Sequence, residues 1–167
     1  MNDSTQLDTI YTFTASSKLN NWRTINDTVM GGVSYSHIKV NEEGNGVFTG
    51  KVSLKNNGGF CSVRYPLPKR RIGKFHSFVL KVYGDGKAYQ FRIKENSEDA
   101  HVYKAVFKTT KQWQEIKIRF DEMFPSFRGQ KLNKPNFSGQ SLEEIAFLIA
   151  NKEEEHFKLL INRIKLM

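Results

Sequence analysis

Apolar and polar residues alternate strictly in three stretches near the middle of the chain. Residues 88–94 read AYQFRIK, residues 102–108 read VYKAVFK and residues 115–120 read EIKIRF. Every second side chain is apolar, which is the period of a strand with one buried and one wetter face. Only Val102 and Val106 interrupt the polar face of the second stretch. The pattern therefore predicts three half-buried strands.

Shorter apolar runs predict further strands on both sides of these three. They cover Ser34–Val40, Gly46–Leu54, Gly59–Tyr65, Phe78–Tyr83, Ile145–Ala150 and His156–Lys165. Turns rich in Gly and Asn separate many of the runs, and the Asp-Gly pair within residues 84–87 predicts a hairpin there. About nine short strands without helical periodicity predict an all-β fold, an antiparallel β-sandwich or jelly roll. The one helical signal, a capping box at residues 141–144, predicts a single turn.

The chain length fits one domain spanning residues 1–167, which is long enough to bury a core without disulfides or metals. A single cysteine, Cys61, excludes an intramolecular disulfide and any zinc cluster of several cysteines. We expect it to be a small buried residue rather than a nucleophile. The first residues do not resemble a signal peptide, and no apolar run approaches the ~20 residues of a membrane helix. We therefore expect a cytoplasmic protein without membrane insertion.

The formal net charge of +9 raises the question of nucleic-acid binding. Lysines and arginines are spread along the chain, and the densest group, residues 69–71, reads as a loop after Pro66 and Pro68. No nucleic-acid motif accompanies this group, so we expect no specific nucleic-acid binding. If the three alternating strands are neighbours, they present one basic face to an acidic partner or to solvent; its members are Gln90, Arg92, Lys94, Lys104, Lys117 and Arg119.

The sequence shows no catalytic constellation. The glycines at residues 84–87 lack the spacing of a phosphate-binding loop, and the four histidines lie far apart without metal-ligand spacing. The acidic run at residues 153–155 is typical of a solvated turn. We therefore expect a protein that is not an enzyme, with no catalytic residue, no metal and no cofactor.

Three loops combine glycines with directional polar groups. They are NDTVMGGVS at residues 26–34, NNGGF at residues 56–60 and the long segment FPSFRGQKLNKPNFSG at residues 124–139. Such loops form recognition sites in many proteins, but they also make tight corners in a sheet. Residue chemistry alone leaves both interpretations open.

These loops carry a resemblance to a known family. The segment from Trp22 to Ser34, the segment GVFTGKVSLKNNGGFCSVR at residues 46–64 and the FPSFRG of residues 124–129 resemble the signature of the complex I intermediate-associated protein family. The motifs occur in the order of the family and cover residues 11–164. The resemblance implies a galactose-binding-like jelly roll, and mitochondrial members act as assembly factors for respiratory complex I. Without a transit peptide, this chain resembles a bacterial stand-alone member.

The resemblance also implies which positions matter. Those that match the family motifs are Asn26, Asp27, Met30, Gly31, Gly32, Ser34, Asn56, Asn57, Gly58, Gly59, Arg64, Phe127 and Arg128. We expect a structural or binding cluster in which these residues tie the loops at 56–59 and 128 together from within. The alternative is that all three loops contact a partner.

The expected function is a non-catalytic, protein-binding or chaperone-like module with an unidentified protein partner. The alternative is a carbohydrate- or small-ligand-binding module, because the same type of sandwich often binds sugars. A sugar site needs an exposed aromatic platform. The candidates are Trp22, Tyr35 and Trp113, with Asn57, Arg92 or Arg128 as hydrogen-bond donors.

Overall fold

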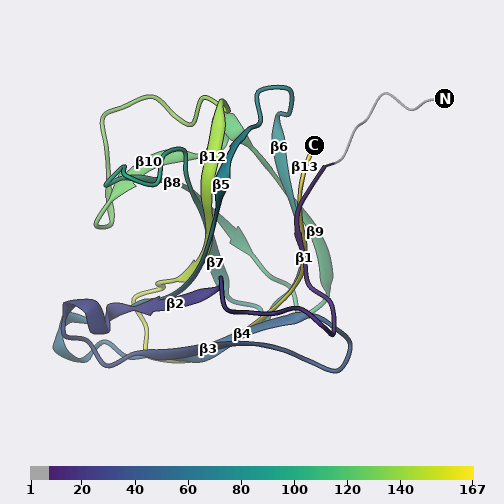
Figure 1. Ribbon diagram of the computed structural model, residues 1–167. Helices are drawn as coiled ribbons and strands as arrows, with labels where there is room; N and C mark the ends of the chain where they lie inside the picture. Colours follow the sequence, from purple (N-terminus) through teal and green to yellow (C-terminus); the bar gives the residue numbers. More distant parts are fainter. Residues whose placement is uncertain (1–7) are drawn as a thin grey trace.

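A computed structural model describes residues 8–167, which form two antiparallel β-sheets packed face to face (Figure 1). In this part of the chain the only helical segments are three short 3₁₀ turns, η1 (Asp27–Met30), η2 (Lys55–Asn57) and η3 (Phe120–Glu122). The antiparallel β-sandwich predicted from the alternating pattern is confirmed.

The six-stranded sheet has the order β3-β4-β13-β6-β9, and β1 also pairs with β13. Its strands are β1 (Asp8–Thr12), β3 (Tyr35–Val40), β4 (Gly46–Val52), β6 (Ser77–Tyr83), β9 (Trp113–Arg119) and β13 (Glu155–Leu166). The strands β3 and β4 form a hairpin directly after η1. The loop that carries the first motif therefore leads into one edge of this sheet.

The seven-stranded sheet has the order β11-β10-β8-β7-β12-β5-β2. Its strands are β2 (Arg23–Asn26), β5 (Cys61–Arg71), β7 (Ala88–Lys94), β8 (Val102–Lys108), β10 (Phe124–Phe127), β11 (Gln130–Lys131) and β12 (Ser141–Ile149). The strands β2 and β10 lie toward opposite edges, so the first and third motif loops are separated by most of the width of this sheet (Figure 1).

The inner faces of the two sheets supply the core. In β7 the side chains of Tyr89, Phe91 and Ile93 are buried, whereas the intervening polar residues remain partly exposed. Rings from the two sheets meet directly, for example Phe78 of β6 and Phe91 of β7, whose centroids lie 5.1 Å apart. Burial of every second residue is what the alternating sequence pattern predicts.

Two local predictions were wrong. Residues 69–71 do not lie in a loop, because β5 continues through Pro66 and Pro68 to Arg71. Only the first part of β5 pairs with β2, so the later part has an open side where a missing proline N–H is tolerated. Residues 141–144 begin β12 rather than a helical turn, because they pair with the last residues of β5.

The turn at residues 84–87 does not close a hairpin. It joins β6 of the six-stranded sheet to β7 of the seven-stranded sheet and therefore forms a corner between the two layers. Asp85 holds this corner, because its carboxylate accepts hydrogen bonds from the Tyr89 hydroxyl and from the backbone N–H of Lys158.

The prediction of one basic face across three neighbouring strands is also wrong. Lys117 and Arg119 lie on β9, which belongs to the six-stranded sheet, whereas the other predicted members lie on β7 and β8 of the seven-stranded sheet.

Candidate functional site

Asp27 is the centre of the first motif, and its side chain is buried at the end of the sandwich. The Oδ1 atom accepts a hydrogen bond of 3.0 Å from the Ser34 backbone N–H. The Oδ2 atom accepts from the Ser34 hydroxyl at 2.5 Å, from Gly59 N–H at 2.6 Å and from Phe60 N–H at 3.2 Å. One carboxylate therefore joins the η1 loop to the loop that follows η2.

Ser34 extends this network to Ser53, the residue that follows β4. Its hydroxyl donates to Asp27 and accepts a hydrogen bond of 2.8 Å from the backbone N–H of Ser53. Burial raises the pKa of the Asp27 carboxyl, but hydrogen bonds from Ser34, Gly59 and Phe60 outweigh burial and hold that pKa below its ordinary value. The carboxylate is thus a charged, internally satisfied group that structures the loops.

Two motif glycines make room for the carboxylate. A Cβ at Gly32 would lie 2.3 Å from Asp27 Oδ1, and one at Gly58 would lie 2.5 Å from Asp27 Oδ2. Both distances are far below van der Waals contact, so these positions require glycine because of close packing rather than backbone conformation. Gly31 differs, because its φ of 91° is the left-handed C-cap of η1 and a Cβ there would meet nothing within 4 Å.

Apolar side chains project outward from the loops that Asp27 holds. Val29, Met30, Val33, Tyr35 and Leu54 account for five of the nine large hydrophobic residues that are exposed in the described part of the chain. We call these five residues the apolar rim. Val33 directly precedes Ser34 and Leu54 directly follows Ser53, the two serines that a hydrogen bond joins. Figure 1 shows η1 and the loop around η2 side by side at this end of the sandwich.

Asn26, Asn56 and Asn57 of the first two motifs lie around the same end of the sandwich, whereas Arg64 does not. Asn26 accepts a hydrogen bond of 2.7 Å from the Ser36 hydroxyl and so joins β2 to β3. Asn56 and Asn57 are exposed and adopt left-handed backbone angles, with φ of 56° and 60°. Arg64 projects instead from the outer face of the seven-stranded sheet, where it lies opposite Arg23.

The third motif is not part of this cluster. Phe127 ends β10 and Arg128 follows it, toward the opposite edge of the seven-stranded sheet from β2. The Arg128 guanidinium lies over the Phe127 ring at 5.2 Å, so the two residues form a local exposed pair. The structure therefore brings the first two motif loops together and leaves the third apart.

The three candidates for a sugar platform do not meet. Trp22 is 4% exposed and packs against Tyr11, Phe13 and Tyr65, so it offers no face to a ligand. Tyr35 and Trp113 are exposed, but they lie on β3 and β9 at opposite edges of the six-stranded sheet. No shared aromatic surface results from these three residues.

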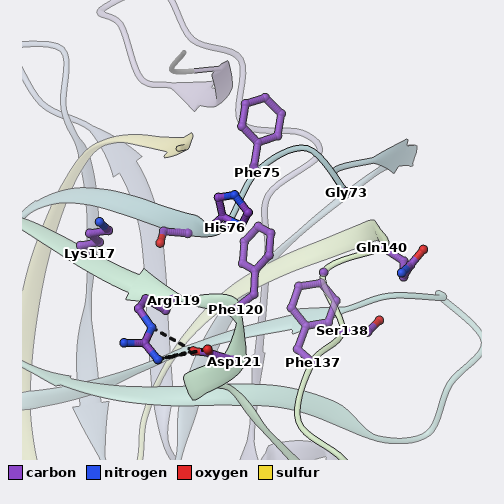
Figure 2. Close-up of a pocket in the computed structure, with 12 residues that line it drawn as sticks. Gly73, Phe75, His76, Lys117, Arg119, Phe120, Asp121, Phe137, Ser138 and Gln140 are labelled. Atoms are coloured by element: carbon purple, nitrogen blue, oxygen red, sulfur yellow. Dashed lines mark hydrogen bonds and ion pairs between the residues drawn. The ribbon is translucent and has the colours of Figure 1, made fainter. Parts of the chain in front are cut away.

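A cavity of about 340 Å³ lies beside η3, where β6 begins and β9 ends, against the loop of residues 137–140 (Figure 2). Rings of Phe75, Phe120 and Phe137 line it. Figure 2 shows that Arg119 and Asp121, on the same wall, are joined by two hydrogen bonds of 3.0 Å. Each charge is therefore neutralised by its neighbour.

Other reactive chemistry is sparse in residues 8–167. No three side chains among His, Cys, Asp and Glu are placed to share a metal ion there. Burial raises the pKa of the Cys61 thiol to about 12, so the thiol is protonated and a poor nucleophile. The same residues include no helix that is long and apolar enough to span a membrane.

Solved structures with the same fold include carbohydrate-binding modules. A family 11 module from a cellulosomal cellulase of Clostridium thermocellum superposes with a TM-score of 0.73, at 17% identity over 99% of this chain and 96% of its own. The family 11 module of that organism in complex with a β-1,3-1,4-mixed-linked tetrasaccharide superposes with a TM-score of 0.72. It is 17% identical, and the match covers 96% of this chain and 95% of the module. A family 29 module superposes with a TM-score of 0.57 and is 11% identical, and the match covers 96% of this chain and 87% of the module. At these identities the likeness establishes the jelly-roll fold.

Sequence relatives extend the comparison to eukaryotes. An uncharacterized protein of Schizosaccharomyces pombe is 25% identical, and the match covers 86% of this chain and 76% of the relative. The profile of the Complex I intermediate-associated protein 30 family matches residues 11–161, which include all three motifs. This family domain and the jelly-roll modules are both non-catalytic in kind. The chain therefore belongs to the Complex I intermediate-associated protein 30 family.

Proposed function

We propose that this protein is a non-catalytic module that binds a partner protein, as an assembly factor does, and that the apolar rim contacts the partner. The observation that carries the proposal is the contrast between the two sides of the motif loops. Asp27 fixes their inner side with four hydrogen bonds, whereas Val29 and Met30 on the outer side are 69% and 66% exposed.

Exposed hydrophobic side chains that cluster on one surface typically mark a contact site for another macromolecule. The rim lies on backbone that the Asp27 network holds in place, so little conformational entropy is lost when a partner binds. Buried hydrogen bonds below an exposed apolar surface are what a preorganised protein-binding site requires. Family membership agrees with this role, since the family is described by its association with an intermediate of complex I.

Affinity purification from the native cell tests the proposal. The test variant is Val29→Ser/Met30→Ser, and the matched control is Tyr83→Ser/Trp113→Ser, which removes two exposed hydrophobics from the six-stranded sheet. We expect quantitative mass spectrometry to show that a protein recovered with wild type is lost, by about tenfold or more, with the rim variant only. Equal recovery with all three proteins would exclude the rim as the contact surface.

Carbohydrate binding is the second candidate function, and one observation favours it. Trp113 is 41% exposed on the outer face of β9, where Tyr83 lies beside it with ring centroids 5.6 Å apart. An exposed indole is the type of surface on which a sugar ring stacks. A glycan array read with wild type and with Trp113→Ser tests this possibility. Absence of binding to any glycan, or binding that Trp113→Ser leaves unchanged, would reject the site.

A further inference from the structure

Strand register places four cationic side chains in one row across the outer face of the seven-stranded sheet. Arg23 of β2 lies opposite Arg64 of β5, and Arg64 lies opposite Ala146 of β12. Ala146 in turn lies opposite Arg92 of β7, which lies opposite Lys104 of β8. Side chains at opposed positions point to the same face, and here the neighbouring residues along each strand supply the core. We call Arg23, Arg64, Arg92 and Lys104 the basic row.

The basic row has no anionic partner within the described residues. The ion pairs of residues 8–167 involve Arg70, Lys87, Arg119 and Arg163, and none of them includes a member of the row. Opposed like charges destabilise a sheet, so the row imposes an energetic cost on the fold.

The charges of the row act on one another. Burial and the charge of Arg64 lower the pKa of Arg92 to about 10. Burial and the charge of Arg92 lower the pKa of Lys104. The charge of Glu144 acts to raise the pKa of Arg92, but the two side chains do not form an ion pair. An external anion would relieve this repulsion.

Two buried polar atoms on this face also lack partners. The Nε atom of Arg92 and the Oε1 atom of Gln90 are both buried without a hydrogen bond. Gln90 lies two positions from Arg92 on β7, so both side chains project from the same face. Buried polar atoms are nearly always satisfied in native proteins. The polar groups of this face are therefore not fully satisfied within the described residues.

The dimensions of the row fit an extended chain. Adjacent strands lie about 4.8 Å apart, so the four spacings from Arg23 to Lys104 span ~19 Å. An extended polypeptide of about six residues covers that length. Its Asp and Glu carboxylates match the guanidinium groups of Arg64 and Arg92 in charge. Ala146, which lies between Arg64 and Arg92 in the row, is itself buried, with 3% of its surface exposed.

We propose that the outer face of the seven-stranded sheet binds an acidic segment of the partner protein, an extended stretch rich in Asp and Glu that crosses the strands along the basic row. This inference rests on the proposed function, because it names the chemistry of part of that partner. The two surfaces adjoin, since β2, which carries Arg23, leads directly into η1 of the apolar rim.

Fluorescence anisotropy with a labelled peptide of alternating Glu and Ser residues tests the acidic-segment proposal, and the matched probe replaces Glu by Gln. The row variant is Arg64→Gln/Arg92→Gln. The control, Lys39→Gln/Lys117→Gln, removes the same charge from exposed positions of the six-stranded sheet. At physiological salt we expect the row variant to weaken binding of the Glu peptide by about tenfold or more and the control by less than about twofold. Arg92→Lys retains the charge, so it should preserve most of the binding.

Equal losses in the row variant and the control would mean attraction by net charge alone and would overturn the inference. Stronger, row-dependent binding of an oligouronate or an oligothymidylate than of the peptide would also overturn it and would identify a different class of ligand. Melting temperatures of both double variants show whether a loss of binding reflects unfolding. Partner recovery with Val29→Ser/Met30→Ser is a separate measurement, so failure of the rim and failure of the row are distinguishable.

Discussion

The Oδ2 atom of Asp27 accepts a hydrogen bond of 2.6 Å from the backbone N–H of Gly59, which lies 32 positions further along the chain. This contact joins the two segments that carry the strongest family motifs. It explains why a buried charge occurs at the end of a sandwich: three backbone N–H groups and a hydroxyl surround it. The resulting loop pair supports the apolar rim.

Replacing Asp27 by Asn should destabilise the fold strongly. Every group that contacts the carboxylate is a donor, so the amide NH₂ of Asn must face at least one N–H or O–H group. We expect a loss of about 3 kcal/mol in the free energy of unfolding, typical of a disrupted buried polar network. Urea unfolding monitored by tryptophan fluorescence measures the change. The control Asp121→Asn removes an exposed carboxylate and should cost less than about 1 kcal/mol; similar losses in both variants would contradict the role of Asp27.

The contribution of Asp27 should depend on pH. Its pKa in the folded protein is lowered by the surrounding donors, so its stabilising effect is complete above the unfolded pKa of about 4. The effect is lost as the pH falls through the folded pKa. The difference in free energy of unfolding between wild type and Asp27→Asn should therefore be constant from pH 7 to pH 5 and shrink below pH 4. The contributions of the other carboxylates are the same in both proteins, so they cancel in this difference. A difference in free energy of unfolding that stays constant down to pH 2.5 would argue against an ionised Asp27.

Glycine substitutions test the packing around the carboxylate. An alanine Cβ would lie 2.3 Å from Asp27 Oδ1 at position 32, but at position 73 the nearest atom is 3.9 Å away. We expect Gly32→Ala to cost about 2 kcal/mol and Gly73→Ala less than about 0.5 kcal/mol. In an Asp27→Ala background the cost of Gly32→Ala should fall, because the two nearest atoms, Oδ1 and Cγ, are gone and only the Cβ of residue 27, at 2.9 Å, remains. Additive costs in this double-mutant cycle, measured by urea unfolding, would mean that Gly32 is required for another reason.

Periodicity predicted the strands well because it reports burial of alternate residues, which is local information. It supplied β7 and β8 nearly residue for residue. It did not predict that the Asp85–Gly86 turn joins two layers, because the sheet that β7 enters depends on its pairing with β8 and β12. Turn chemistry is the same for a hairpin and for a corner between sheets.

Parts of the candidate site were predictable because short segments of the sequence match the family motifs. The motif residues Asp27, Ser34 and Gly58 stood out in the sequence, and Val29 was visible as an apolar residue in a polar loop. The expected link to Arg128 was not borne out, since sequence order says nothing about which edge of the sheet a loop occupies. The predicted basic face contained Arg92 and Lys104, but Arg23 and Arg64 were missed, because only the structure gives the register that aligns all four strands.

The apolar rim gives a last prediction, in which stability and binding separate. Val29 and Met30 are 69% and 66% exposed, so Val29→Ser/Met30→Ser should change the free energy of unfolding by less than about 0.5 kcal/mol. The control Val52→Ser creates a cavity and buries a hydroxyl at a fully buried position, and it should cost about 3 kcal/mol. A rim variant that folds normally but loses its partner requires a role for these side chains outside the fold. A loss above about 1 kcal/mol would instead place them in the packing of the loops, and the partner surface would then lie elsewhere.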